Sequence, residues 1–242
     1  MGVFVLAVFL LLLALGTWQM QRRVWKLQLI HAVATRVHGE ATPAPDPGAW
    51  PAVTAEHDAY RKVFVSGVFD NSRETLVMAL TDLGSGFWVL TPMKTDAGYT
   101  VLINRGFTPD DKRDAESRPS GLLQGRTTVT GLLRVSEPGG GFLHKNDPLG
   151  HHWYSRDVTA IGHAQGLTTL APYFIDADSQ PNPGGWPVGG LTVVSFPNSH
   201  LIYALTWYGM AALLAWASLT LVWSRRRRPA NGKSFDDRAE PA

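Results

Sequence analysis

Two long apolar segments lie towards the two ends of the chain and bracket a region of mixed polarity. Residues 1–20 contain no charged side chain, and their centre, GVFVLAVFLLLLALG, is almost wholly apolar. Residues 200–223 form the second segment, which is uncharged and largely apolar from Leu201 to Trp223. At about 1.5 Å per residue the second segment extends roughly 34 Å, which exceeds a hydrocarbon core of about 30 Å. The pattern predicts two transmembrane helices, at 1–20 and at 200–223.

The first apolar segment has an alternative interpretation as a cleaved signal peptide, with Ala14-Leu15-Gly16 as a loose small-x-small cleavage site. A signal peptide normally begins with basic residues, and none precedes this apolar core. The apolar run is also long for a signal peptide. We therefore expect an uncleaved helix.

The basic residues beside the apolar segments predict an orientation. Arg225 to Arg228 follow the second segment directly, and arginines at a helix end favour the cytoplasmic side. Arg22, Arg23 and Lys26 favour the opposite orientation, but they precede a long domain, which translocates largely regardless of charge. We expect both termini in the cytoplasm, with residues 224–242 as a basic cytoplasmic tail. The central domain is then periplasmic, or on the equivalent side of an organelle membrane.

The central region changes from helical to strand-like periodicity along its length. Residues 21–40 are expected to continue the first helix outside the membrane, because apolar residues recur there at helical intervals. Residues 41–52, ATPAPDPGAWPA, are expected to form a proline-rich linker. Residues 53–197 are expected to form a β-rich domain. Its predicted elements are strands in YRKVFVSGVFD, ETLVMAL, GRTTVTGLLRV and APYFIDAD, a hairpin in GFWVLTPMKTDAGYTVLINRGFTP that turns at Asp96-Ala97-Gly98, and a short helix in DVTAIGHAQG closed by Gly166.

The predicted fold class is a membrane protein with two transmembrane helices bracketing a mainly antiparallel β (α+β) extramembrane domain. The composition then removes several classes of function. The chain has no cysteine, which excludes disulfides, thiolate metal sites, a cysteine nucleophile and covalent c-type haem. A net charge of +2 leaves no basic face for nucleic acid. Ser66 and Ser195 lack a G-x-S-x-G context, and Asp110-Asp111 are adjacent rather than opposed across a cleft. We therefore expect no enzyme and no catalytic residues.

Three segments occur in order along nearly the whole chain. They are GTWQMQRRVWKLQLI after the first apolar segment, VLINRGFTP in the middle, and NSHLIYALTWYGMA opening the second. In this combination the chain resembles the surfeit locus protein 1 family of cytochrome c oxidase assembly factors. It departs from the family in having no charged residue before the first span.

The resemblance implies a location and a set of partners. Family members lie in the bacterial or mitochondrial inner membrane and assist maturation of the oxidase subunit that houses haem a. The implied partners are the catalytic subunit of cytochrome c oxidase, the haem a supply machinery and the lipid bilayer, with no nucleic acid. Some bacterial members resemble haem a-binding proteins in which a histidine of the second span is implicated, and that residue matches His200.

The residues around His200 are compatible with this role. His200 lies in the first turn of the second helix, with Asn198 or Ser199 as the expected N-cap. The positive end of a helix dipole favours neutral imidazole, which is the form that ligates iron. A small residue between two aromatic residues on the same face leaves room for a flat ring. The residues at i+3, i+4 and i+7 are Tyr203, Ala204 and Trp207.

In the expected topology the first helix ends at the outer interface, where the second begins. Arg22 or Arg23 would then pair with haem propionates. The candidate haem a-binding residues are His200, Tyr203, Trp207, Trp18, Arg22 and Arg23, with His200 as the hypothetical ligand of the haem iron. Met20 is open as a second ligand or as a packing residue, and five-coordinate iron is equally compatible. The alternative interpretation is an interfacial histidine within a belt of aromatic residues.

Two other polar motifs have competing interpretations. Asn104-Arg105-Gly106 reads as a turn with Arg105 in a surface ion pair, or as a contact surface for the oxidase subunit or the haem edge. The segment HKNDPLGHHWYSRD concentrates three histidines and two aspartates, which can bind copper or zinc. His151 and His152 are adjacent, however, and neighbours in a strand point to opposite faces. A polar loop is therefore favoured.

We arrive at one main hypothesis and one alternative. The first is an assembly factor for cytochrome c oxidase that assists haem a insertion or retention during maturation of the catalytic subunit, acting by binding and delivery. The alternative is a haem-free membrane chaperone that stabilises the oxidase core subunit.

Overall fold

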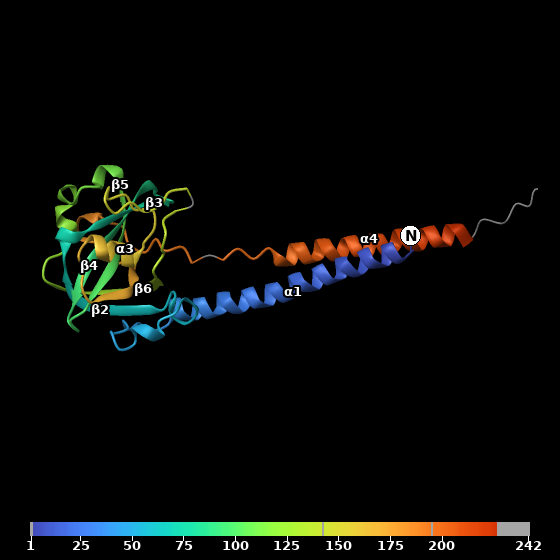
Figure 1. Ribbon diagram of the computed structural model, residues 1–242, viewed down its shortest axis with the longest axis horizontal. Helices are drawn as coiled ribbons and strands as arrows, with labels where there is room; N and C mark the ends of the chain where they lie inside the picture. The colour runs from blue at the N-terminus through green and yellow to red at the C-terminus, as the bar shows by residue number, and fades with distance from the viewer. Residues whose placement is uncertain (1, 142, 195, 227–242) are drawn as a thin grey trace, which may run out of the picture. The chain divides into compact units, whose positions relative to one another are not determined.

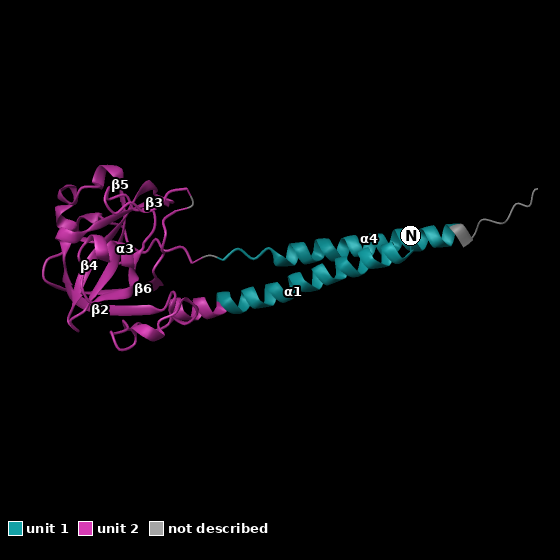
Figure 2. Cartoon of the chain, in the orientation of Figure 1, with its two compact units in different colours: residues 1–30, 196–242 teal, residues 31–195 magenta. Residues whose placement is uncertain are grey.

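The computed structural model describes residues 2–141, 143–194 and 196–226 (Figure 1). The chain divides into two compact units, residues 1–30 with 196–242 and residues 31–195, which Figure 2 colours separately. Residues 227–242, which make up most of the expected basic tail, lie outside the described residues.

Two long helices make up the described part of the first unit, apart from a short segment that precedes the second helix. They are α1 (Gly2–His38), whose last residues belong to the second unit, and α4 (His200–Arg226). Each is long and apolar enough to cross a membrane. α1 is uninterrupted, so the predicted span at 1–20 and the predicted outer helix at 21–40 are parts of one element.

Five strands of the second unit close into a barrel, because β2 pairs with β6 on one side and with β4 on the other. The order around the barrel is β2-β6-β7-β5-β4, in which β5 and β7 are parallel and the other neighbours antiparallel. This is the strand order of a Greek-key barrel of the OB type, a fold that hosts many activities. The barrel strands are β2 (Lys62–Phe69), β4 (Gly84–Thr95), β5 (Thr100–Pro109), β6 (Arg126–Val135) and β7 (Leu170–Ala177).

Smaller elements surround the barrel (Figure 1). β1 pairs with β2 and β3 pairs with β4, so these two strands extend the sheet beyond the closed barrel. The remaining elements are β1 (Thr42–Pro43), β3 (Thr75–Thr81), α2 (Ala55–Asp58), α3 (Val158–Ala164) and 3-10 turns at Trp50–Ala52, Asn71–Arg73, Asp110–Lys112, Ala115–Ser117, Pro119–Gly121 and Pro183–Gly185.

The strands, the hairpin and the short helix predicted from the sequence are present. The β4–β5 hairpin turns at Gly98, which has a φ of 86°. α3 begins after Asp157, whose side chain accepts a hydrogen bond from the amide of Ala160, and ends before Gly166 at a φ of 61°. The alternation of apolar and polar residues was sufficient to identify these elements.

The apolar side chains of the barrel form two clusters, because successive residues of a strand point to opposite faces. On β5, Val101 and Ile103 belong to the interior cluster, whereas Leu102 belongs to the outer one. α3 covers the outer cluster and buries Val158 and Ile161 in it. β5 is therefore buried on both faces.

The segment 41–52, predicted as a linker, instead packs onto the barrel. Pro45 accepts hydrogen bonds at its carbonyl from Trp50 Nε1 (3.0 Å) and from the Tyr173 hydroxyl (2.6 Å). The Trp50 ring lies edge-on to Tyr99, with 5.6 Å between centroids. Burial raises the pKa of Tyr173 far above its usual range, so its hydroxyl remains a hydrogen-bond donor. The segment connects α1 to the barrel and also forms part of the barrel's packing.

A buried charge network joins β6, β7 and the chain before α3. We call Asp176, Glu137, Arg134 and Arg156 the Asp176 network. Asp176 is 2% exposed and forms ion pairs with Arg134 (3.0 Å) and Arg156 (3.1 Å), while Glu137 pairs with the same two arginines. Burial alone would lower the pKa of Arg156, but Asp176 and Glu137 raise it above its usual value.

The Asp176 network predicts a large effect of one isosteric substitution. We expect Asp176→Asn to lower the free energy of unfolding by roughly 3–5 kcal/mol, because two largely buried guanidinium groups then share one carboxylate. Asp96→Asn is the control, since Asp96 pairs with Arg126 at the surface, and it should leave that free energy nearly unchanged. Equilibrium unfolding followed by tryptophan fluorescence measures both variants. Equal losses would contradict the network's role.

Candidate functional site

α1 and α4 pack against each other within the first unit in an antiparallel arrangement. Thr17 Oγ1 lies 3.1 Å from the Tyr208 hydroxyl, and Gln19 Oε1 lies 2.8 Å from His200 Nδ1. A later residue of α1 therefore meets an earlier residue of α4. This agrees with the expectation that the end of the first apolar segment and the start of the second lie at the same level.

Small residues permit this close packing. Ala204 and Ala211 are fully buried on the face of α4 that also carries His200 and Tyr208. Gly16 is buried on α1, and a Cβ atom at this position would lie only 2.6 Å from the ring of Tyr208. Small side chains at a helix–helix interface let the backbones approach closely, as in many membrane helix pairs.

The His200 imidazole is partly buried and makes a hydrogen bond to the neighbouring helix. Its partner, the Gln19 Oε1 atom, is a carbonyl oxygen and can only accept. His200 Nδ1 is therefore the donor and carries the proton. In a neutral ring the other nitrogen, Nε2, then presents a lone pair, which is what a metal ligand requires.

The other predicted haem-binding residues lie near Gln19 or His200 in the sequences of α1 and α4. Trp18 and Tyr203 are each 54% exposed, and Trp207 is partly buried. Arg22 lies over the ring of Trp25, with Cζ 4.2 Å from the centroid. Met20 and Arg23 are partly buried.

One prediction about the space beside His200 is wrong. Ala204 was expected to leave room for a flat ring, but it is fully buried in the helix pair. The helix pair therefore leaves no room for a planar group over Ala204, whereas the aromatic side chains of Trp18 and Tyr203 are exposed. Ser199 precedes the first helical residue, and its carbonyl accepts from the amide of Tyr203 (3.3 Å).

Sequence reasoning overlooked Gln19 and the packing role of Tyr208. Both depend on how two segments far apart in the chain are aligned, which a single sequence does not specify. The spacing of residues on α1 could have indicated a role for Gln19. Gly16, Gln19 and Arg23 recur at i, i+3 and i+7 and so share one face of the helix.

Asn198 adds an unsatisfied acceptor two residues before His200. Its Oδ1 atom is buried and makes no hydrogen bond to any residue that the structure describes. Buried polar atoms normally have partners. Asn198 Oδ1 is therefore available to a donor from a bound molecule or from water.

Both interpretations of Arg105 as a surface residue are wrong. Arg105 is 2% exposed inside the barrel, because it follows Val101 and Ile103 on the inward face of β5. Its Nη2 donates to the carbonyl of Gly121 and to Asn182 Oδ1 (3.0 Å), and its Cζ lies 4.9 Å from the centroid of the Phe69 ring. The pKa of Arg105 is lowered to about 10, chiefly by burial. The negative charge of Glu74 raises this pKa, and the positive charge of Arg118 lowers it further.

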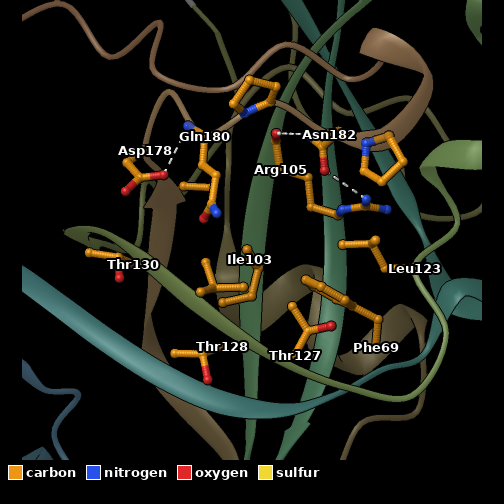
Figure 3. A pocket seen from close by; sticks show the side chains of 14 residues that line it. Phe69, Ile103, Arg105, Leu123, Thr127, Thr128, Thr130, Asp178, Gln180 and Asn182 are labelled. Atoms are coloured by element: carbon orange, nitrogen blue, oxygen red, sulfur yellow. Dashed lines mark hydrogen bonds between the residues drawn. The ribbon is translucent and has the colours of Figure 1, made fainter.

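Arg105 connects two loops at a small cavity of about 280 Å³ (Figure 3). The loops carry Gly121 and Asn182, and the guanidinium is their shared donor. Gly106 has a φ of 129°, and Asn104 Oδ1 accepts from its amide (3.2 Å), so these two residues do shape the backbone. The motif is a structural element of the barrel interior.

The histidine-rich loop forms no metal cluster within the described part of the chain. No three His, Asp or Glu side chains come together there in a way that could hold a metal ion. His144 instead stacks on Tyr154, with 4.9 Å between ring centroids.

Several exposed apolar side chains of the second unit belong to this loop or to β3 and the turn that follows it. Leu80 of β3 and Leu143 are both largely exposed and border one cavity of about 490 Å³ together with Met78. Leu83 at the β3–β4 turn and Leu149 are exposed as well. We call Met78, Leu80, Leu83, Leu143 and Leu149 the apolar rim.

The helix packing predicts that Gly16 is intolerant of a side chain. We expect Gly16→Ala to weaken the α1–α4 interface by roughly 1–3 kcal/mol, because the added methyl group overlaps the Tyr208 ring. Gly209→Ala is the control, since a Cβ atom there meets nothing within 4 Å. The chain has no cysteine, so cysteines introduced at the exposed positions Leu10 and Leu213 report helix separation through spin-label distances. Unchanged distances and stability in Gly16→Ala would contradict the packing.

The sequence comparisons agree with this architecture. The profile of the SURF1 family matches residues 6–212. Surfeit locus protein 1 of Homo sapiens is 39% identical over 216 residues, which cover 82% of this chain and 69% of the relative. The Mus musculus protein is 40% identical over 215 residues, 82% and 68% of the two chains, and the Takifugu rubripes protein is 35% identical over 216 residues, 82% and 87%. The match covers most of α1, the barrel and the first part of α4, and the chain belongs to the SURF1 family.

Proposed function

We propose that this protein is an assembly factor for cytochrome c oxidase that holds haem a as cargo at the α1–α4 pair and delivers it to the catalytic subunit. Membership of the SURF1 family supports the assembly role. The observation that carries the haem part is the His200–Gln19 contact, which leaves His200 Nε2 as a lone-pair donor.

The donor groups around His200 fit a haem. His200 Nε2 would donate the lone pair that coordinates the haem iron. Gln19 holds the imidazole, and Trp18 and Tyr203, which neighbour these residues on α1 and α4, carry exposed aromatic surface. Arg22 and Arg23 lie about one turn beyond Gln19 on α1 and are the residues that would pair with propionates.

The proposal places both long helices in the inner membrane. Their length and apolar composition support it, as does the arginine run 225–228, which begins in the last turn of α4. In this topology both termini are cytoplasmic and the barrel is periplasmic. His200 and Gln19 then lie at the outer interface, where a haem keeps its propionates in the polar layer and its apolar tail in the acyl layer.

The apolar rim favours a second candidate function, a haem-free chaperone that stabilises the oxidase core subunit. Exposed leucines on an edge strand and its neighbouring loop are suited to binding a protein partner. The two functions make different demands on His200, since the chaperone does not need an iron ligand.

The haem proposal predicts a spectroscopic loss on removing one side chain. We expect protein purified in mild detergent from cells that make haem a to show the haem a band, and His200→Ala to lose most of it. His163→Ala is the control, because His163 is an exposed residue of α3. Visible absorption measures all three, and spin-label distances between α1 and α4 verify that the variant remains folded. A colourless wild type under haem-replete conditions, with the oxidase subunit co-purified, would reject the carrier and favour the chaperone.

A further inference from the structure

We propose that Gln19 is a positioning residue that fixes the tautomer of His200 and so makes Nε2 the iron-binding atom. The inference rests on the proposed haem function, but it concerns a property of this chain that exists without haem. Gln19 does not touch the iron in this arrangement and acts only through the imidazole.

The geometry limits which atom of His200 can bind a metal. Nδ1 lies 2.8 Å from Gln19 Oε1, a normal hydrogen-bond distance. A nitrogen engaged in this bond cannot also bind iron, so Nε2 is the atom left for ligation. The contact joins residues 181 positions apart in the sequence, so it exists only when α1 and α4 are aligned.

The chemistry of the partner decides the tautomer. An amide oxygen accepts and never donates, so it stabilises the proton on Nδ1. An isolated neutral histidine exchanges its proton between the two nitrogens, and the tautomer with the proton on Nε2 has no lone pair there. Metal-binding histidines commonly donate their other ring N–H to an oxygen, which fixes the ring and increases the basicity of the ligand. Gln19 supplies this interaction from the opposite helix.

A purely mechanical role is the competing explanation for the contact. The helix pair is already joined by the Gly16–Tyr208 packing and by the hydrogen bond between Thr17 and Tyr208. Cross-helix hydrogen bonds of this kind contribute only modestly to helix association. A mechanical role would change helix distances but would leave the tautomer of His200 undetermined, so the two roles have different readouts.

The first experiment uses the haem-free full-length protein. ¹⁵N-labelled histidine spectra at mildly alkaline pH report which ring nitrogen is protonated, and subtraction of the His200→Ala spectrum identifies His200. We expect the proton on Nδ1 in the wild type and a shift of the population towards Nε2–H in Gln19→Leu. Gln21→Leu is the matched control, because Gln21 is an exposed glutamine two residues along the same helix. A wild-type spectrum with the proton on Nε2, or one that Gln19→Leu leaves unchanged, would overturn the inference.

The second experiment adds haem a to the same proteins. We expect Gln19→Leu to weaken haem binding roughly 10- to 100-fold, as for other partners of metal-binding histidines. Gln19→Glu keeps an acceptor and should retain the haem, with a more negative reduction potential because a carboxylate makes the imidazole a stronger donor. A Gln19→Glu protein that loses haem as fully as Gln19→Leu would contradict the acceptor role.

The two experiments separate the inference from the proposed function. The tautomer is measured without haem, so a wild type that shows Nδ1–H but binds no haem a rejects the haem function and leaves the His200–Gln19 relation intact. A wild type that binds haem a through His200, with no change of tautomer, affinity or potential in Gln19→Leu, rejects Gln19 as the positioning residue and leaves the haem function standing.

Discussion

The contact between the Tyr208 ring and the bare backbone of Gly16 determines the alignment of the two long helices. A Cβ atom at residue 16 would occupy the space of that ring, so the close approach of α1 and α4 at this point depends on the glycine. One turn further along α1, the same alignment places Gln19 opposite His200. The polar contact that the proposed function needs is therefore a consequence of an apolar packing constraint.

The second unit contains two groups of buried charged side chains. Asp176 accepts from two arginines, from Asn104 and from Thr192, so the carboxylate is fully engaged although it is almost inaccessible. Arg105 is buried on the inward face of β5 and contacts neutral acceptors and the Phe69 ring. The first arrangement balances its charges locally. The second buries a cation that makes no ion pair with any carboxylate of the described residues, and this burial lowers the pKa of Arg105.

Much of the fold could be predicted from the sequence, because strand alternation and long apolar runs are local properties. β2, β5 and α3 follow directly from such patterns. The burial of Arg105 could not be predicted in this way. Alternation shows which residues of a strand share a face, but not which face the barrel encloses. The packing of the segment 41–52 could not be predicted either. Its prolines suggested a linker, and the aromatic residues that it contacts, Tyr99 and Tyr173, lie far away in sequence. His200 could be nominated from its position in the helix, whereas Gln19 required the alignment of α1 against α4.

His200 is the first residue of α4, and this position bears on how a bound group would leave. Helix ends unwind more readily than helix centres, since the terminal amides lack partners within the helix. Opening the first turn breaks few backbone hydrogen bonds, among them those that Ser199 accepts from Ile202 and Tyr203. A ligand in the middle of the helix could be withdrawn only by disrupting several turns or by moving the whole helix. If His200 coordinates a cargo as proposed, placement at the terminus would let it hold that cargo while keeping the barrier to release low, a kinetic property suited to transfer rather than storage.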